Sequence, residues 1–211
     1  MVRIGDWETG KWGYIDKDGR YVINPQFDNA WAFSEGLAQV MIGDKYGYIN
    51  KEGKYVIEPQ FDYAYDFSEG LARVNIGGKP DEYGIITGGK WGYINKEGRY
   101  VINPQFDSAW NFSEGLAAVK IGGKWGYIDK DGRYVINPQF DDAWAFSEGL
   151  ARVRIGDWET GKWGYIDKEG KFVINPQFDN AWNFSEGLAL VKIGEKYFYI
   201  NKEGQIVYGY E

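Results

Sequence analysis

The sequence predicts an all-β fold: a tandem array of six three-stranded antiparallel meanders, stacked as an open solenoid or superhelix. Self-similarity is the first observation, because the aromatic residue that opens each copy recurs at intervals of 34 to 45 residues, at Trp12, Tyr46, Trp91, Trp125, Trp163 and Tyr197. Short aromatic and β-branched runs separated by turn residues are the second. The third is the small size of each meander, which is marginally stable alone and needs neighbours.

Composition and charge restrict the class of protein. The chain has 211 residues, 18% of them aromatic, and a mean hydropathy of −0.51. Its formal charge is −7 and its Lys and Arg are spread along the copies, so the basic patch of a nucleic-acid-binding protein is missing. No apolar run reaches the roughly 18 residues of a membrane span, and no signal peptide is recognisable. We expect a single repeat domain over residues 1–211, no nucleic-acid or membrane partner, and an unknown compartment.

The opening hairpin of the first copy is predicted from two runs of strand-forming residues, Trp12–Ile15 and Tyr21–Ile23. Asp16–Gly19 joins them as a tight turn, in which the Asp side chain bonds backbone N–H groups and Gly19 takes a positive φ. This turn also resembles the start of a calcium loop, but Phe27 stands where that loop needs its glutamate. We expect a plain hairpin turn and no metal.

Leu37–Ile42 is predicted to form the third strand of the meander. Every second residue of this strand stays apolar from copy to copy, whereas the alternate positions vary and include Arg73, Asn75 and Arg154. Such alternation indicates one buried face and one largely wet face. The first two strands are apolar on both faces, so neighbouring sheets must cover them.

The segment Pro25–Gly36 joins the first copy to the second, and its counterparts join the later copies. Its aromatic residues are expected to cover the gap between sheets, and Pro25 is expected to end the preceding strand. The copies then occupy residues 1–24, 37–58, 71–103, 116–137, 150–175 and 188–211, joined by Pro-Gln-Phe-Asp to Ser-Glu-Gly connectors.

Length variation concentrates in the loop between the third strand and the next hairpin. The longer forms are Gly5–Lys11, Gly77–Lys90 and Gly156–Lys162. Repeat proteins commonly place binding loops at such insertions. The candidate ligand-binding residues are the aromatic side chains in these loops, Trp7, Trp158 and Tyr83.

The last copy departs most from the pattern, since Phe198 replaces the glycine that follows the aromatic. Terminal repeats are atypical because one face lacks a neighbour, which favours an open array. The alternative is a closed six-bladed, propeller-like ring in which each connector supplies an irregular fourth strand. Copies of about 34 residues are short for such blades.

Three motifs recur in register along nearly the whole chain: Lys-Trp-Gly-Tyr-Ile followed by Asp-x-x-Gly, then Pro-Gln-Phe-Asp, then Phe-Ser-Glu-Gly-Leu-Ala-x-Val. They resemble the WG repeats, also called KWG repeats, of bacterial tandem-repeat proteins. Departures are Tyr46 and Tyr197 for the tryptophan and Phe198 for the glycine. The resemblance implies a β-repeat array with a structural or interaction role and no shared catalytic residues. The close similarity among copies indicates recent amplification or a consensus design.

The chemistry-bearing residues do not predict an enzyme. Asp28 and Glu35 could be paired acids of a hydrolase, but they recur in almost every copy, whereas catalysis needs one distinct site. Capping of connector N–H groups explains them better. The chain has no histidine and no cysteine, and no nucleophile lies beside a base. We expect no catalytic residue and no cofactor.

The leading hypothesis is a non-catalytic repeat scaffold with a structural or protein-interaction role. The alternative is a multivalent module that binds glycans or cell walls, because aromatic rings such as Trp12 and Tyr14 can carry pyranose rings. Their regular strand positions favour core packing instead. The expected partners are a protein or a glycan, and the chain is expected to be a monomer or to self-associate weakly through its exposed sheet ends.

Overall fold

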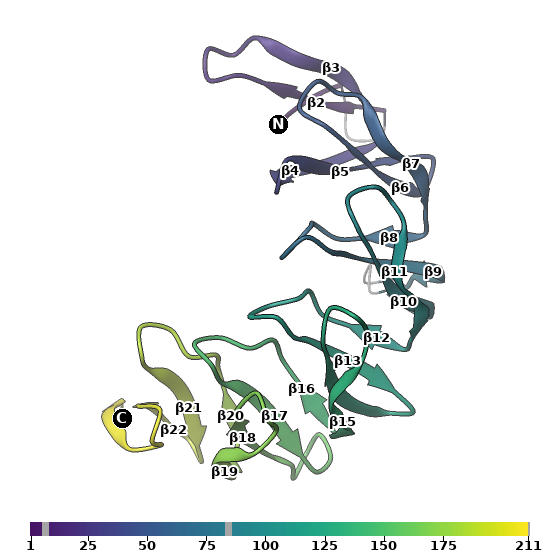
Figure 1. Cartoon of the computed structure of the whole chain (residues 1–211). Coiled ribbons are helices and arrows are strands. Elements are labelled where there is room, and N and C mark those ends of the chain that lie inside the picture. Colours follow the sequence, from purple (N-terminus) through teal and green to yellow (C-terminus); the bar gives the residue numbers. More distant parts are fainter. Residues whose placement is uncertain (6–8, 83–85, 211) are drawn as a thin grey trace. The chain divides into compact units, whose positions relative to one another are not determined.

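The computed structural model describes residues 1–5, 9–82 and 86–210. These residues form six antiparallel sheets and no helix, and no sheet closes into a barrel (Figure 1). The predicted all-β array of antiparallel meanders is therefore confirmed. The chain divides into two compact units, Met1–Gln105 and Phe106–Glu211, each built mainly from three consecutive sheets.

The first unit holds one three-stranded and two four-stranded sheets, in the orders β1-β2-β3, β4-β5-β6-β7 and β8-β9-β10-β11. Its strands are β1 Val2–Ile4, β2 Lys11–Ile15, β3 Tyr21–Phe27, β4 Asn29–Ser34, β5 Leu37–Ile42, β6 Lys45–Ile49, β7 Tyr55–Phe61, β8 Tyr63–Ala64, β9 Ala72–Pro80, β10 Ile86–Ile94 and β11 Tyr100–Phe106. The last residue of β11 is already part of the second unit.

The second unit holds three four-stranded sheets, in the orders β12-β13-β14-β15, β16-β17-β18-β19 and β20-β21-β22-β23. Its strands are β12 Ser108–Ala109, β13 Ala117–Ile121, β14 Lys124–Ile128, β15 Tyr134–Phe140, β16 Asp142–Ala143, β17 Ala151–Ile155, β18 Lys162–Ile166, β19 Phe172–Phe178, β20 Asn180–Ala181, β21 Ala189–Ile193, β22 Lys196–Ile200 and β23 Ile206–Tyr210.

The connectors contain more strand than the sequence indicates. β3 runs on to Phe27, one residue follows, and β4 opens the next sheet. β4 pairs with β5, so that Ala30 lies opposite Val40. The connector thus adds a fourth, edge strand to the meander that follows it.

Pro25 lies inside β3, so the prediction that it ends the strand was wrong. Trp12 pairs with Phe27 and Tyr14 with Ile23, which leaves two more residues on β3 than on β2 between these pairs. The extra residues form a bulge. Proline is tolerated there because it has no N–H to donate to the ladder.

The bulge explains the glycine that follows the aromatic. A Cβ atom at Gly13 would lie 2.6 Å from the Ile23 carbonyl oxygen and 2.7 Å from the Pro25 nitrogen. Both contacts are with backbone, which cannot move aside as a side chain can. The same close approach recurs at Gly47, Gly92, Gly126 and Gly164.

The core lies between successive sheets of each unit. In the first unit, one cluster joins Tyr14 and Ile23 of the first sheet to Ala38 and Ile49 of the second. The turn residue Gly53 packs on Ile23, where a Cβ would lie 3.1 Å from the side chain. Because each apolar cluster draws on two sheets, neighbouring sheets stabilise one another.

Candidate functional site

One set of repeated polar residues joins neighbouring sheets within each unit. Lys45 Nζ donates to Asp62 Oδ1 at 2.5 Å, and the Gly77 N–H donates to Asp62 Oδ2 at 2.6 Å. The hydrogen bond from Lys45 and the Gly77 N–H lower the pKa of Asp62, although desolvation opposes them. Equivalent Lys–Asp pairs are Lys11–Asp28, Lys124–Asp141 and Lys162–Asp179.

The glutamates of three Ser-Glu-Gly turns make a second set of contacts between neighbouring sheets. Glu148 Oε2 accepts from the Gly187 N–H at 2.9 Å and lies 3.3 Å from Lys202 Nζ, which also donates to the Glu148 carbonyl at 2.9 Å. Glu148 has a φ of 53°, a left-handed conformation that is uncommon outside glycine. Glu35 and Glu114 make the same contacts with Gly70 and Lys96, and with Gly149 and Lys168.

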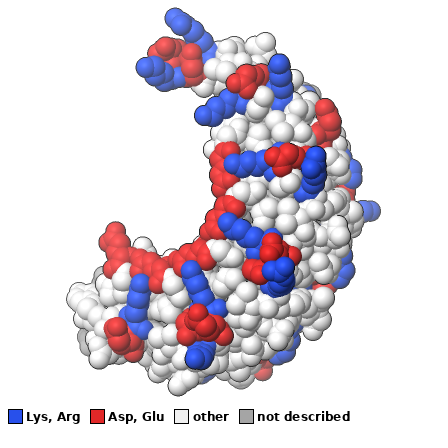
Figure 2. Space-filling model, viewed as in Figure 1, with Lys and Arg blue, Asp and Glu red and all other residues white. Residues whose placement is uncertain are grey.

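Asp28 and Glu35 are therefore bound to backbone N–H groups and lysines. Asp28 accepts from the Gly43 N–H at 2.8 Å, and Glu35 from the Gly70 N–H at 3.0 Å. The predicted capping of a connector N–H is confirmed for Glu35, whereas Asp28 caps the turn between β5 and β6. Figure 2 shows basic side chains that lie beside acidic ones on that face.

A repeated tyrosine supplies the third set of contacts. Tyr48 is fully buried, and its hydroxyl donates to the Tyr65 carbonyl of the next sheet at 2.7 Å. Burial raises the pKa of Tyr48 well above its usual range, so the hydroxyl keeps its proton. Tyr14 makes the same bond to the Trp31 carbonyl at 2.8 Å and is 6% exposed. Tyr14 therefore packs in the core and does not form a surface platform, whereas Trp12 is half-buried.

The variable face of the third strand is covered, so the prediction of a wet face was wrong. Arg73 is 8% exposed, and its guanidinium lies 3.5 Å from the centroid of the Tyr65 ring and 5.3 Å from that of Trp91. Arg152 lies 4.1 Å from the centroid of the Trp144 ring. Tyr65 and Trp144 directly follow the short edge strands β8 and β16. Their rings cover the cations and attract them through cation–π interaction.

The insertion Gly156–Lys162 is a compact loop that is fixed by its own hydrogen bonds. Asp157 Oδ1 accepts from the Glu159 N–H at 3.0 Å, the Thr160 N–H at 2.7 Å and the Thr160 hydroxyl at 2.8 Å. The Thr160 N–H and hydroxyl lower the pKa of Asp157. The loop Gly156–Lys162 is therefore preformed.

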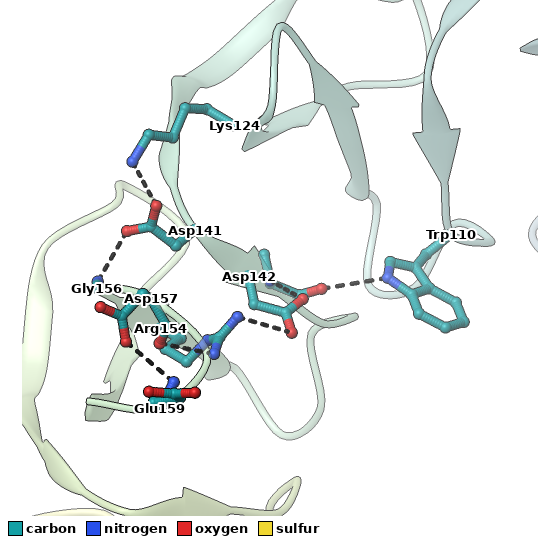
Figure 3. A network of polar contacts seen from close by, with 9 residues as sticks. Trp110, Lys124, Asp141, Asp142, Arg154, Gly156, Asp157 and Glu159 are labelled. Atoms are coloured by element: carbon teal, nitrogen blue, oxygen red, sulfur yellow. Dashed lines mark hydrogen bonds and ion pairs between the residues drawn. The ribbon is translucent and has the colours of Figure 1, made fainter. Parts of the chain in front are cut away.

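Figure 3 shows the Arg154 guanidinium between this loop and Asp142. Its Nη1 donates to the Asp157 carbonyl at 2.9 Å, and its Nη2 lies 4.0 Å from Asp142 Oδ2. Arg154 is 9% exposed, and its buried Nε has no acceptor in the described part of the chain. The guanidinium lies 5.2 Å from the centroid of the Trp158 ring and 5.8 Å from that of Trp163.

Trp158 is 82% exposed, and of the two predicted insertion tryptophans it is the one that lies among the described residues. A small cavity of about 120 Å³ lies beside it, lined by Arg154, Trp158, Gly161, Trp163, Asp179 and Asn180. The cavity thus brings together an indole face, a guanidinium, a carboxylate and an amide. This chemistry suits a ligand that offers both an apolar face and hydrogen-bonding groups.

The other two predicted site residues, Trp7 and Tyr83, lie outside the described residues. The insertion that contains Tyr83 lengthens β9 and β10 into a long hairpin, in which Gly78 pairs with Gly88. Asn75 is fully buried there, and its Oδ1 accepts from the Gly78 N–H at 2.9 Å. This insertion continues the sheet.

Sequence reasoning missed Arg154, Asp179 and Asn180 as neighbours of Trp158. The alternation predicts a wet strand face for Arg154, although its position two residues before the insertion could have linked it to the loop. Asp179 and Asn180 come from the next copy, so only the stacking of two sheets brings them to the cavity. No local motif records that contact.

No helix in the described ranges is long and apolar enough to cross a membrane. No curated protein matches the chain. Among solved structures, a eukaryotic initiation factor is 15% identical with a TM-score of 0.59, over 92% of this chain and 59% of that one. The chain thus spans 59% of the length of that structure.

Two further solved structures are similar at lower scores. Hsv2p of Kluyveromyces lactis is 13% identical with a TM-score of 0.49, over 90% of this chain and 74% of that one. A protein of unknown function from Bacteroides caccae is 14% identical with a TM-score of 0.37, over 98% of this chain and 92% of that one. Structural neighbours include propeller-like folds, and at these identities the likeness concerns the fold alone.

The family comparison rests on sequence. The model of the WG containing repeat matches five consecutive segments, residues 12–46, 46–79, 91–125, 125–157 and 163–197. These segments begin at the repeated aromatic residues and cover most of the chain. The chain therefore belongs to the family of WG-containing repeats.

Proposed function

We propose that this chain is a non-catalytic repeat scaffold that binds a protein partner through the variable loop Gly156–Lys162. Membership of a repeat family indicates a repeat-based scaffold or interaction module. The observation that carries the proposal is the contrast between repeated and inserted residues. The repeated Asp, Glu, Lys and Tyr side chains hold neighbouring sheets together, whereas Trp158 projects from a fixed loop and is 82% exposed.

An exposed tryptophan on a fixed loop is well suited to anchor a protein interface. Tryptophan is enriched among the residues that dominate binding energy, and a preformed loop loses little conformational entropy on binding. Arg154 beneath the ring adds a buried cation that a partner carbonyl or carboxylate can approach through the adjacent cavity.

The test compares the chain with a variant in which Gly156–Lys162 is replaced by Gly-Gly-Lys, the short loop found at Gly122–Lys124. A photo-crosslinking amino acid at position 158 identifies proteins that bind the loop. The affinity of an identified, purified partner for the chain should then fall at least about tenfold in the short-loop variant and in Trp158→Ala. A partner that binds both variants as tightly as the original chain would contradict the loop as the binding site.

Glycan binding is the second candidate, favoured by the cavity of about 120 Å³ in which Trp158 adjoins Arg154, Asp179 and Asn180. An indole face packs on pyranose C–H groups, and the polar groups would bond hydroxyls. Soluble cell-wall fragments should quench the tryptophan fluorescence of the chain, and the double variant Trp7→Ala, Trp158→Ala should reduce this effect. Unchanged emission at millimolar fragment concentrations would reject this candidate.

A further inference from the structure

The acceptor oxygens of the cavity of about 120 Å³ are already bonded within the chain. Lys162 Nζ donates to Asp179 Oδ1, and the Gly194 N–H donates to Asp179 Oδ2 at 2.6 Å. Asn180 Oδ1 accepts from the Ala181 N–H at 2.9 Å. A ligand that enters the cavity therefore finds few acceptors for N–H or O–H groups of its own.

The hydrogen-bond donors of the same cavity are open to a ligand. Arg154 lines the cavity and is 9% exposed, and its buried Nε has no acceptor among the residues that the structure describes. Because Asn180 uses its oxygen on the backbone, its remaining capacity is the two N–H donors of the amide. The indole N–H of Trp158 is a further donor, on a side chain that is 82% exposed. A buried donor without an acceptor costs free energy, so a ligand oxygen that reaches Arg154 removes that cost.

The charges around the cavity favour a neutral acceptor over a carboxylate. Asp142 Oδ2 lies 4.0 Å from Arg154 Nη2, and the insertion adds the exposed carboxylates of Asp157 and Glu159. The lysine of the insertion does not offset these charges, because it is paired with Asp179. These carboxylates repel an incoming anion but do not repel a neutral carbonyl.

The insertion offers an aromatic ring and no strand edge. The N–H groups of Glu159 and Thr160 donate to Asp157 Oδ1, at 3.0 and 2.7 Å. The Gly161 N–H donates to the Asp157 carbonyl at 3.1 Å. Because these backbone donors are taken, an added β-strand finds no ladder here. A ligand must bind through the Trp158 ring and the side-chain donors.

The sequence links the arginine and the asparagine of the cavity to the insertion. Residues 3–17 and 154–168 are identical, and the connector that follows each stretch carries an Asp-Asn pair, at residues 28–29 and 179–180. The copies with other loops have different residues at these two positions, namely Met41 and Tyr63, Asn75 and Ser108, and Lys120 and Asp142. The arginine and the asparagine therefore accompany the Asp-Trp-Glu-Thr-Gly loop and are not part of the general repeat.

We infer, on the basis of the proposed function, that the protein partner reaches this cavity with a proline-rich segment in the polyproline II conformation. Proline has no N–H, so the segment brings carbonyl acceptors and apolar rings without donors that the cavity would leave unpaired. Its carbonyls are free of internal hydrogen bonds and bond to Arg154 and Asn180. Its rings pack on Trp158, since proline-rich segments dock against aromatic side chains. A sugar hydroxyl is a donor as well as an acceptor, and the cavity's oxygens are already occupied.

The probe is end-capped hexaproline, titrated into the isotope-labelled full chain. We expect saturable shifts of the Arg154 Nε–H and Trp158 indole N–H resonances. Asn180→Asp should weaken this binding at least about tenfold, because an acceptor replaces the amide donor. The variant keeps the backbone contact, as Asp142 Oδ1 accepts from the Ala143 N–H at 2.9 Å in the preceding copy.

Asn183→Asp is the matched control, because Asn183 is exposed and does not line the cavity. It adds the same charge and should leave the affinity for hexaproline unchanged. A capped peptide of alternating alanine and glycine should not bind, since its N–H groups find no acceptors. Equal binding of that peptide, or an affinity that Asn180→Asp does not change, would overturn the inference.

The partner identified by crosslinking at position 158 separates this inference from the proposed function. Hexaproline should compete with that partner for the chain. If the partner binds in a loop-dependent manner and hexaproline neither shifts the two resonances nor competes, the proline segment is rejected and the proposed function stands. If cell-wall fragments shift both resonances and hexaproline shifts neither, the ligand is a glycan and the inference is rejected. A partner that binds the short-loop variant equally well would contradict the proposed function instead.

Discussion

In the sheet β16–β19, Gly164 faces the proline bulge of the neighbouring strand, whereas in the sheet β20–β23 the same position is Phe198. A Cβ at Gly164 would lie 2.6 Å from the Ile174 carbonyl oxygen and 2.7 Å from the Pro176 nitrogen. Phe198 instead pairs directly with Gly209 in a strand without that bulge. The bulky group therefore lies on β19 in the first of these sheets, opposite Gly164, and on β22 in the second, opposite Gly209.

This difference shows that the glycine and the proline of the repeat form one structural device. The glycine is required by the backbone that the bulge brings toward it, and not by a special φ of its own, since no positive φ occurs at Gly164. Where the bulge is absent, an aromatic side chain is accommodated and the small residue lies opposite. A Cβ at Gly209 would lie 2.9 Å from Phe198 Cδ1.

The largest expected effect is that of Gly164→Ala. The added methyl group meets backbone atoms on β19, so we expect a loss of more than ~3 kcal/mol in the free energy of unfolding. Urea denaturation of the full chain measures it. Phe198→Ala is the matched control at the same repeat position, and a loss at Gly164 no larger than the control's would contradict the role of the bulge.

A smaller effect is expected from Gly209→Ala, which should cost about 1 kcal/mol because the new methyl group displaces the Phe198 ring. In a Phe198→Gly background the same change should cost less than ~0.5 kcal/mol, since the ring is gone. The double-mutant cycle measures this coupling. Additive effects would show that the two residues do not share one space.

The bulge and the ionic contacts between sheets differ in their pH dependence. Hydrogen bonds from Lys124 to Asp141 and from Lys162 to Asp179 lower the pKa of each carboxyl group. A lowered folded-state pKa adds stability that is fully present above the unfolded value of about 4 and is lost as the pH falls through the folded value. We therefore expect the urea midpoint to decrease when the pH is lowered below ~4.

Asp141→Asn should lower the urea midpoint at pH 7 and make that midpoint fall less steeply in acid. The loss in the free energy of unfolding should be less than ~1 kcal/mol, because the Lys124–Asp141 pair is partly exposed. The loss in the free energy of unfolding from Gly164→Ala should be the same at pH 7 and in acid, since no charge takes part in the bulge contact. A midpoint that Asp141→Asn leaves unchanged at every pH would mean that this ion pair contributes nothing measurable.

The smallest effect is expected at the insertion. Trp158→Ala should change the free energy of unfolding by less than ~0.5 kcal/mol, because the side chain is 82% exposed. Trp163→Ala should cost about 3 kcal/mol, because Trp163 is 7% exposed and occupies the repeated core position. Comparable losses from both variants would show that the loop is part of the fold and is no separate binding element.

Some local features could be predicted because their causes lie within a few residues. The Asp16 side chain accepts from the Asp18 and Arg20 N–H groups, each at 2.9 Å, as the turn chemistry indicated. The predicted strands Leu37–Ile42 and Tyr21–Ile23 are present, the latter within a longer strand. Turn residues and alternating apolar residues act through neighbours in sequence, so the sequence records them directly.

The surroundings of Arg73 and Arg154 could not be predicted in the same way. The alternation predicts a wet face for each, because charged residues at alternate strand positions are usually solvated. Tyr65, which covers Arg73, follows the edge strand β8, and the edge strand β16 pairs its Asp142 with Arg154. Sequence reasoning treats both edge strands as irregular connectors. Without these strands, neither the burial of Arg154 nor its place beneath Trp158 follows from the pattern.

The amino-acid sequence by itself determined the period of the repeat, its hairpins and turns, and its membership of the WG-containing repeats, because strand propensity and turn chemistry act over short distances. Only the tertiary structure decided why the glycine must follow the aromatic, what the repeated acids bind, and which residues surround Trp158. Those contacts join groups far apart along the chain, as Glu35 and Gly70 are at a separation of 35 residues. They exist only once one sheet has stacked on the next.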